Sequence, residues 1–182
     1  MSIKRSVHRL ALIGLVLACA VGLAAAADLG GTTWDLGGMV KTKVKKVGRE
    51  AENLELATLT FNEDGTCSLD FYLQMPTEWV PTVSIGCTWE SGNGRRFAVD
   101  FDDEDLTQAL TGVVTALYGM SPSDVQVSTE KAKGKVSKDM ERIKLKVKVK
   151  AEGGVVVNGE TVTRRIRMKL ALTGTAHESS GR

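Results

Sequence analysis

The chain has 182 residues, of which 24 are Lys or Arg and 22 are Asp or Glu, and only 5% are aromatic. Three of the basic residues lie in an expected leader, so residues 28–182 hold 21 bases against 22 acids, a net charge of −1. This balance gives no overall attraction to nucleic acid. The 155 residues after the leader suffice for one domain with a sizeable core.

Residues 1–27 have the order of a secretory signal peptide: a basic start, an apolar run over residues 10–23 and four alanines before Asp28. The basic residues are Lys4, Arg5 and Arg9. The apolar run has 14 residues, fewer than the roughly 20 that span a bilayer as a helix. We expect cleavage after Ala27 and export to an oxidising compartment, either the periplasm or the outside of the cell. An alternative is lipidation of Cys19, since Val-Leu-Ala-Cys loosely resembles a lipobox.

After the leader, most of the chain alternates apolar and polar residues with a period of two, the pattern of strands with one buried face. Turn residues divide it into eight predicted strands. These strands cover residues 32–47, 56–61, 66–73, 83–89, 95–101, 124–136, 142–157 and 160–173.

Two turns in the first half predict hairpins. Glu63-Asp64-Gly65 suits a three-residue loop with its glycine in the left-handed conformation. It gives the apolar pairs Phe61–Cys67, Leu59–Leu69 and Ala57–Phe71. Gly92-Asn93-Gly94, taken as centred on its asparagine, gives the pairs Trp89–Phe97, Cys87–Val99 and Ile85–Phe101.

Cys67 and Cys87 are the only cysteines outside the leader, and two thiols in an oxidising compartment usually pair. Setting them opposite each other extends the apolar face by two pairs, Leu69–Ile85 and Phe71–Val83. We therefore predict a disulfide between adjacent antiparallel strands inside the core. The alternative is two buried free thiols.

One segment breaks the period of two. Its apolar residues recur at intervals of three and four, which predicts an amphipathic helix. They are Leu106, Leu110, Val113, Val114, Leu117 and Tyr118. Asp102 or Asp103 suits the N-cap, acidic residues at 104 and 105 suit the positive end, and Gly119 with Pro122 ends the helix.

Asn158-Gly159 joins the last two predicted strands and is the strongest short hairpin signal, because both residues tolerate the positive φ of a type I′ turn. The two-residue turn fixes the register, and a slip by one residue would expose the whole apolar set. The resulting pairs are Ala151–Ile166, Val149–Met168, Val147–Leu170 and Leu145–Leu172.

Sequential hairpins that share one apolar face close most simply as an up-and-down barrel, which leaves no free edge. The predicted fold class is all-β: an antiparallel up-and-down barrel of about eight strands, with one amphipathic helix inserted after strand five. We expect residues 28–174 to form this single domain and residues 175–182 to form a flexible tail.

Three short motifs resemble the lipocalin or calycin superfamily. Residues 31–36, Gly-Thr-Thr-Trp-Asp-Leu, resemble the Gly-x-Trp start of the first lipocalin strand with one residue more, and residues 86–90, Gly-Cys-Thr-Trp-Glu, are similar. Residues 61–66 resemble the second-to-third strand turn of lipocalin-like bacterial domains and of small exported bacterial barrels. The resemblance implies a barrel with an apolar cavity, no cofactor and Trp34 closing one end. In lipocalins, however, the helix follows strand eight.

The chain offers little catalytic machinery. His8 lies in the leader and His177 in the expected tail, so no histidine is placed as a base or metal ligand, and a Ser or Cys nucleophile lacks its usual partner. One acidic cluster has the oxygen ligands of a Ca²⁺ site but lacks the EF-hand spacing, and helix capping explains it. It comprises Asp100, Asp102, Asp103, Glu104 and Asp105. We expect neither an enzyme nor a metal site.

Ten cations are predicted on the outer face of the first and last two strands, in a chain whose residues 50–105 hold 13 acids and 2 bases. They are Lys41, Lys43, Lys45, Lys144, Lys146, Lys148, Lys150, Arg165, Arg167 and Lys169. Two interpretations remain: a solvated face that guards against edge pairing, or a site for a polyanion such as lipopolysaccharide, anionic lipid or an acidic polymer. Nucleic acid is disfavoured, because no aromatic residues interleave the cations.

Six aromatic residues are predicted inside the barrel: Trp34, Phe61, Phe71, Trp89, Phe97 and Phe101. A barrel of eight strands is either just filled or holds one small ligand. Since the small residues Gly38, Thr42, Ala57 and Ala151 also face inward, we predict a lipocalin-like, non-enzymatic binding protein for a small apolar ligand. Polyanion binding is the alternative. An outer-membrane barrel is less favoured, because aromatic girdles at both rims are missing.

Overall fold

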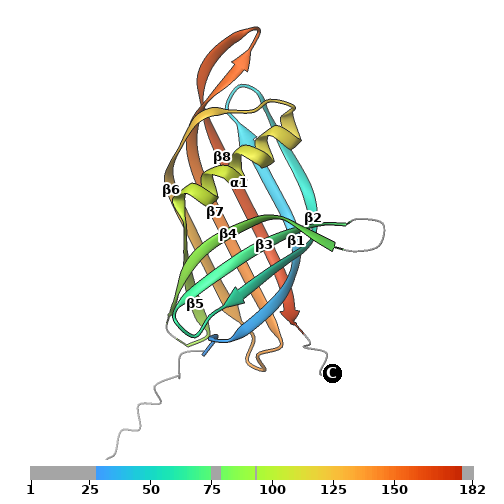
Figure 1. Ribbon diagram of the computed structural model, residues 1–182, viewed down its shortest axis with the longest axis vertical. Helices are drawn as coiled ribbons and strands as arrows, with labels where there is room; N and C mark the ends of the chain where they lie inside the picture. Colours follow the sequence, from blue (N-terminus) through green and yellow to red (C-terminus); the bar gives the residue numbers. More distant parts are fainter. Residues whose placement is uncertain (1–27, 75–78, 93, 178–182) are drawn as a thin grey trace, which may run out of the picture.

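A computed structural model describes residues 28–74, 79–92 and 94–177 of the protein. The predicted leader and Cys19 lie outside the described residues. The described residues form eight strands and one helix (Figure 1). The strands are β1 (Thr32–Val44), β2 (Gly48–Phe61), β3 (Thr66–Gln74), β4 (Trp79–Ser91), β5 (Arg96–Phe101), β6 (Ser123–Val136), β7 (Arg142–Val157) and β8 (Glu160–Ala176), and the helix is α1 (Asp103–Tyr118).

The strands pair with their neighbours in chain order, all antiparallel, and β1 pairs with β8, so the sheet closes into a barrel. This confirms the predicted fold class, including the helix after the fifth strand. No helix among the described residues is long and apolar enough to cross a membrane.

The apolar side of each strand faces the interior. Along β7, every second residue from Ile143 to Ala151 is buried, while the lysines between them are exposed. This orientation is the reverse of the one that an outer-membrane barrel requires. Burial of this alternating face supplies most of the driving force for the fold.

The last hairpin has the predicted register. Asn158 and Gly159 adopt positive φ angles of 53° and 83°, as a type I′ turn requires, and all four predicted apolar pairs lie opposite each other. β8 then runs to Ala176, because Thr175 and Ala176 pair with the start of β1. The last strand therefore continues into the segment expected to be a tail, of which residues 178–182 lie outside the described residues.

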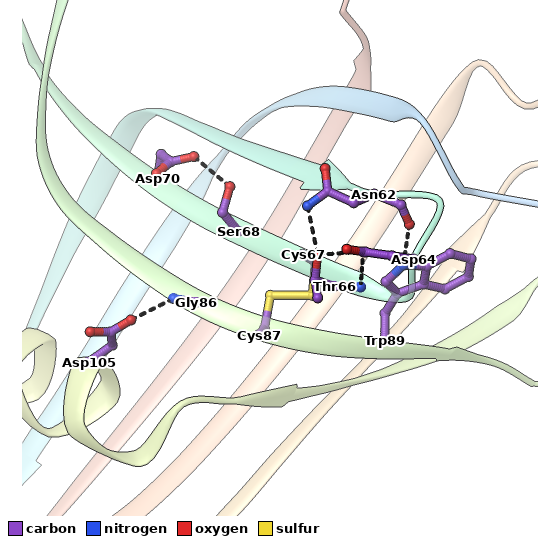
Figure 2. The surroundings of a disulfide bond; sticks show 10 residues. All are labelled: Asn62, Asp64, Thr66, Cys67, Ser68, Asp70, Gly86, Cys87, Trp89 and Asp105. Atoms are coloured by element: carbon purple, nitrogen blue, oxygen red, sulfur yellow. Dashed lines mark hydrogen bonds between the residues drawn. A yellow bond between two sulfur atoms is a disulfide. The ribbon is translucent and has the colours of Figure 1, made fainter.

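The predicted pairings of β2 with β3 and of β3 with β4 are also confirmed. Gly65 supplies the left-handed residue of the loop, with φ 85°. Cys67 and Cys87 face each other with their Cα atoms 4.8 Å apart and form the predicted disulfide (Figure 2), so the alternative of two free thiols is wrong. Both cysteines are buried.

The predicted register of β4 with β5 is wrong by two residues. Cys87 pairs with Phe101 instead of Val99, and Trp89 pairs with Val99 instead of Phe97. The cause is the position of the turn: it is centred on Gly94, whose φ is 68°, and the Gly92 N–H donates to the Arg96 carbonyl at 2.8 Å. A shift by two keeps the same face buried, because strand side chains alternate with a period of two.

β2 is longer than the sequence pattern predicts and begins at Gly48. Leu36 of β1 pairs with Ala57, but Gly38 pairs with Leu54, so β2 carries one extra residue between these pairs. Such a bulge exchanges the two faces of a strand. Glu52 of β2 consequently pairs with the inward-facing Val40. Because the first half of β2 is polar, it shows no apolar alternation, and the sequence pattern does not predict it as a strand.

Helix α1 is capped at both ends as predicted. The Asp102 carboxylate accepts hydrogen bonds from the backbone N–H groups of Glu104 and Asp105, at 2.9 and 3.1 Å. Gly119 ends the helix in the left-handed conformation, with φ 66°. β5 pairs with β6 only from Arg96 to Val99, so the two strands separate beyond Val99. Helix α1 crosses the barrel where they separate and packs against β4 and β6 (Figure 1).

Candidate functional site

The barrel interior has a filled half and a hollow half. In the filled half, the ring of Phe61 makes edge-to-face contacts with Trp89 and Phe97, at centroid distances of 5.3 and 5.2 Å. Trp34 is 1% exposed, and its Nε1–H donates to Thr32 Oγ1 at 2.9 Å. These four aromatic residues pack at the end of the barrel where β1 begins, and none of them lines the cavity in the other half.

The hollow half contains a cavity of about 590 Å³ beneath α1. The two remaining predicted aromatics, Phe71 and Phe101, line it. Most of its other walls are aliphatic and come from the strands and the inner face of the helix. They include Val40, Leu54, Leu69, Val83, Ile85, Leu106, Ala109, Val113, Leu117, Val147, Met168 and Leu170.

The cavity opens where β2 and β3 separate. β2 pairs with β3 only from Ala57 to Phe61, so within the described residues the first half of β2 has no strand partner on this side. Polar lining residues gather at this opening: Glu52, Asn53 and Glu55 are exposed, and Tyr72 is half-buried. The site is thus an apolar chamber with two carboxylates at its rim.

Both ends of α1 are fixed to the barrel, which makes the helix a firm wall of the chamber. At its start, Asp105 Oδ2 accepts a hydrogen bond from the Gly86 N–H of β4 at 2.8 Å (Figure 2). At its end, the Tyr118 hydroxyl donates to the Thr42 carbonyl of β1 at 2.9 Å, and burial raises the pKa of Tyr118. The chamber is therefore preformed rather than dependent on a moving element.

The acidic cluster has structural roles. Asp102 caps α1, and Asp105 joins the helix to β4. Within the described part of the chain, no three His, Cys, Asp or Glu side chains come together in a group that could hold a metal ion. His177, which follows β8, contacts Asp35 at 2.8 Å from Nδ1 to Oδ2, and both side chains are exposed.

Sequence reasoning missed one acidic residue, Glu130 of β6. It lies half-buried beside Asp100, where strand β5 ends. Desolvation, followed by repulsion from Asp100 and Asp103, raises the pKa of Glu130 to about 7, although the backbone N–H of Phe101 opposes the shift. Nothing in the sequence pattern indicates this, because Glu130 directly precedes a run of lysines at alternate positions.

All ten predicted cations are exposed: nine lie on the outer surface of β1, β7 and β8, and Lys45 lies in the turn directly after β1. Three further cations, not predicted for this surface, lie beside them: Lys131, Lys133 and Lys135 of β6 pair directly with Lys148, Lys146 and Lys144 of β7. We call these thirteen residues the cationic face. Their strands are the same ones whose inner residues, such as Val147 and Leu170, line the chamber.

The sequence pattern could not separate the chamber from the filled core. The period of the helix residues Leu106, Val113 and Leu117 predicts only an apolar helix face, whereas in the structure these residues line an open space. The signal that could have revealed this is the contrast between bulky aromatics at one end of the strands and small or aliphatic residues at the other.

No protein-family model matches the chain, and no curated protein matches it. Among solved structures, it is similar to a protein of unknown function from Bacteroides ovatus, with 8% sequence identity and a TM-score of 0.39. The similarity covers 85% of this chain and 50% of that one, so the chain spans half the length of that structure. The closed barrel of eight antiparallel strands is compatible with the calycin-like architecture that the motifs resemble, but no family match places the chain among the lipocalins.

Proposed function

We propose that the protein is an exported, non-enzymatic binding protein that holds one small apolar ligand in the chamber beneath α1. The observation that supports this is the size and lining of the chamber. Its volume of about 590 Å³ falls within the range of ligand pockets, about 300–1,000 Å³, and its walls are mostly apolar. The Cys67–Cys87 disulfide is consistent with the oxidising compartment that residues 1–27 predict.

The rim suggests which ligands fit. A ligand whose body fills the chamber would place its polar end near the exposed Glu52 and Glu55. Two carboxylates repel an anionic head group and attract a cationic one. We therefore propose an apolar molecule with a neutral or cationic end, in preference to a fatty-acid carboxylate.

Uptake of a neutral fluorescent probe, N-phenyl-1-naphthylamine, tests the proposal, because its emission rises in apolar surroundings. Intrinsic fluorescence of Trp34 or Trp89 is a poor readout, since neither residue lines the chamber. Saturable uptake that unlabelled dodecanol reverses is the expected result.

The variant Gly112→Phe identifies the site. Gly112 lines the chamber, and a Cβ there would meet no atom within 4 Å, so the new ring can enter the opening without a clash. Probe affinity should fall about tenfold. Thr115→Phe adds the same ring at an exposed position of the same helix that does not line the chamber, and should leave affinity unchanged. Equal affinity of both variants and the unsubstituted protein would rule out the chamber as the binding site.

A further inference from the structure

The cationic face is a two-dimensional array of positive charge. Lys41, Lys169, Lys148 and Lys131 lie opposite one another in a single row across β1, β8, β7 and β6. Neighbouring strands are about 4.8 Å apart, and residues on one side of a strand repeat about every 6.7 Å. The array is therefore dense in both directions.

The array is almost free of counter-charge. Among the described residues, the only ion pair on this face joins Arg165 Nε to Glu152 Oε1 at 3.6 Å. Like charges directly opposite each other destabilise a sheet. Lys148–Lys169, Lys150–Arg167 and Lys41–Lys169 are such pairs. An external anion would remove this repulsion.

Two shallow clefts lie among the cationic side chains of β1 and β8, with Arg49 of β2 at the first and Lys45, directly after β1, at the second. The first, about 180 Å³, is lined by Lys41, Lys43, Arg49, Arg167 and Lys169 together with Thr42. The second, about 160 Å³, is lined by Lys43, Lys45, Arg165 and Arg167. The clefts share Lys43 and Arg167, so they adjoin. Apart from Thr42 in the first cleft, every lining residue is basic, so both clefts offer positive charge to an oxyanion.

We propose that the cationic face docks the protein on an anionic phospholipid membrane, with lipid phosphates in the two clefts. An array that extends in two directions matches a charged surface better than a single linear polymer, which would follow one row. Eleven of the thirteen residues of the cationic face are lysines, which are mobile point charges suited to attraction without a fixed partner geometry.

The opposite charge elsewhere in the chain sets the orientation. Residues 50–105, which form β2 to β5 and the start of α1, hold 13 acids and 2 bases. An anionic surface repels that part of the barrel and attracts the cationic face, so the protein binds with β1, β8, β7 and β6 toward the lipid. Membrane docking does not depend on ligand binding in the chamber, so either proposal can be wrong without the other.

Sedimentation with vesicles tests the docking. The unsubstituted protein should bind phosphatidylcholine vesicles that contain phosphatidylglycerol and should not bind vesicles of pure phosphatidylcholine. It should dissociate from the anionic vesicles as the salt concentration is raised. Each basic residue near such a surface contributes about a fivefold factor, so Lys41→Gln/Lys43→Gln/Lys169→Gln should weaken binding about 100-fold. The triple variant should fold at least as stably, because it removes like-charge pairs.

A matched control removes three exposed cations that line neither cleft: Arg95→Gln/Lys138→Gln/Arg142→Gln. It should bind nearly as well as the unsubstituted protein. Equal losses in both triple variants would show attraction by net charge alone and would overturn the proposal. Binding to pure phosphatidylcholine would do the same. Salt-sensitive binding to heparin without binding to the anionic vesicles would identify a soluble acidic polymer as the partner instead of a membrane.

Discussion

Phe97 and Gly134 lie directly opposite each other on β5 and β6, and the ring of Phe97 occupies the space that a side chain at position 134 would need. The glycine has an ordinary strand conformation, so the reason for it is the approach of the ring and not its backbone freedom. An aromatic side chain that covers a glycine across a strand pair protects the backbone there and fixes the register.

Gly134→Ala should therefore destabilise the protein by about 1–3 kcal/mol, the usual cost of overpacking a core. Phe97 cannot simply turn away, because it also packs against Phe61 in the filled half of the barrel. Urea denaturation measures the change. Combining the substitution with Phe97→Leu should recover part of the loss in a double-mutant cycle.

Gly112→Ala is the matched glycine control. It lies in α1 with open space around its Cβ, and alanine should raise the free energy of unfolding by about 1 kcal/mol through helix propensity. If both substitutions changed stability in the same direction, crowding by Phe97 would not explain the effect at position 134.

The disulfide should contribute about 3 kcal/mol to the free energy of unfolding. It joins cysteines separated by 20 residues, and cross-linking a loop of this size restricts the unfolded chain by about that amount. Cys67→Ala/Cys87→Ala should lower the urea midpoint accordingly. The same shift should follow reduction of the unsubstituted protein, and slowly, since both cysteines are buried. An unchanged midpoint after complete reduction would contradict the prediction.

Most strand pairings could be predicted from the sequence, because a register wrong by one residue does not place the apolar residues opposite one another. Asn158-Gly159 defines a two-residue turn, and a one-residue error would have placed Lys148 inside. The turn at residues 92–96 offered two possible centres, Asn93 and Gly94, and moving the centre by one residue shifts every pairing by two. Choosing either centre kept the apolar face inward, so alternation could not detect the two-residue error.

The candidate site was harder to predict, because it depends on where the strands stop pairing. The bulge opposite Leu36 turns Glu52 toward the chamber, and the end of pairing at Ala57 creates the opening. Both features interrupt alternation and carry no local sequence signal. The six aromatics were all assigned to the interior, yet their distribution between a filled and a hollow half follows from strand tilt and register across the whole barrel.

Head-group preference should distinguish the acidic rim from a purely apolar chamber. With twelve-carbon ligands, dodecylamine and dodecanol should displace the probe more effectively than dodecanoate near neutral pH, and the amine should exceed the carboxylate by about threefold to tenfold. Glu52→Gln/Glu55→Gln should narrow this difference, because it removes both rim carboxylates.

Glu63→Gln/Glu104→Gln removes the same number of exposed carboxylates away from the opening and should leave the preference in place. Equal displacement by the amine and the carboxylate in the unsubstituted protein would show that the rim does not select. Failure of all three ligands would instead contradict the chamber as a binding site, so the two results can be told apart.

Glu130 should make stability fall as the pH rises toward neutrality. Its pKa is raised from 4.5 to about 7 in the folded protein, so between these values the folded state binds more protons than the unfolded state. The contribution of Glu130 to the free energy of unfolding is therefore greatest below about pH 4.5 and declines as the pH rises through 7. Above pH 7 the charged carboxylate lies half-buried beside Asp100 and opposes folding.

Glu130→Gln should remove this cost. The variant should match the unsubstituted protein near pH 4.5 and exceed it at pH 8 by the order of 1 kcal/mol, once solvent screening of a partly exposed side chain is included. Urea denaturation of both proteins across this range isolates Glu130 from every other titrating group. Asp100→Asn should move the decline to lower pH, because it removes the nearest repelling charge. A difference between Glu130→Gln and the unsubstituted protein that does not vary with pH would show that Glu130 does not titrate in this window.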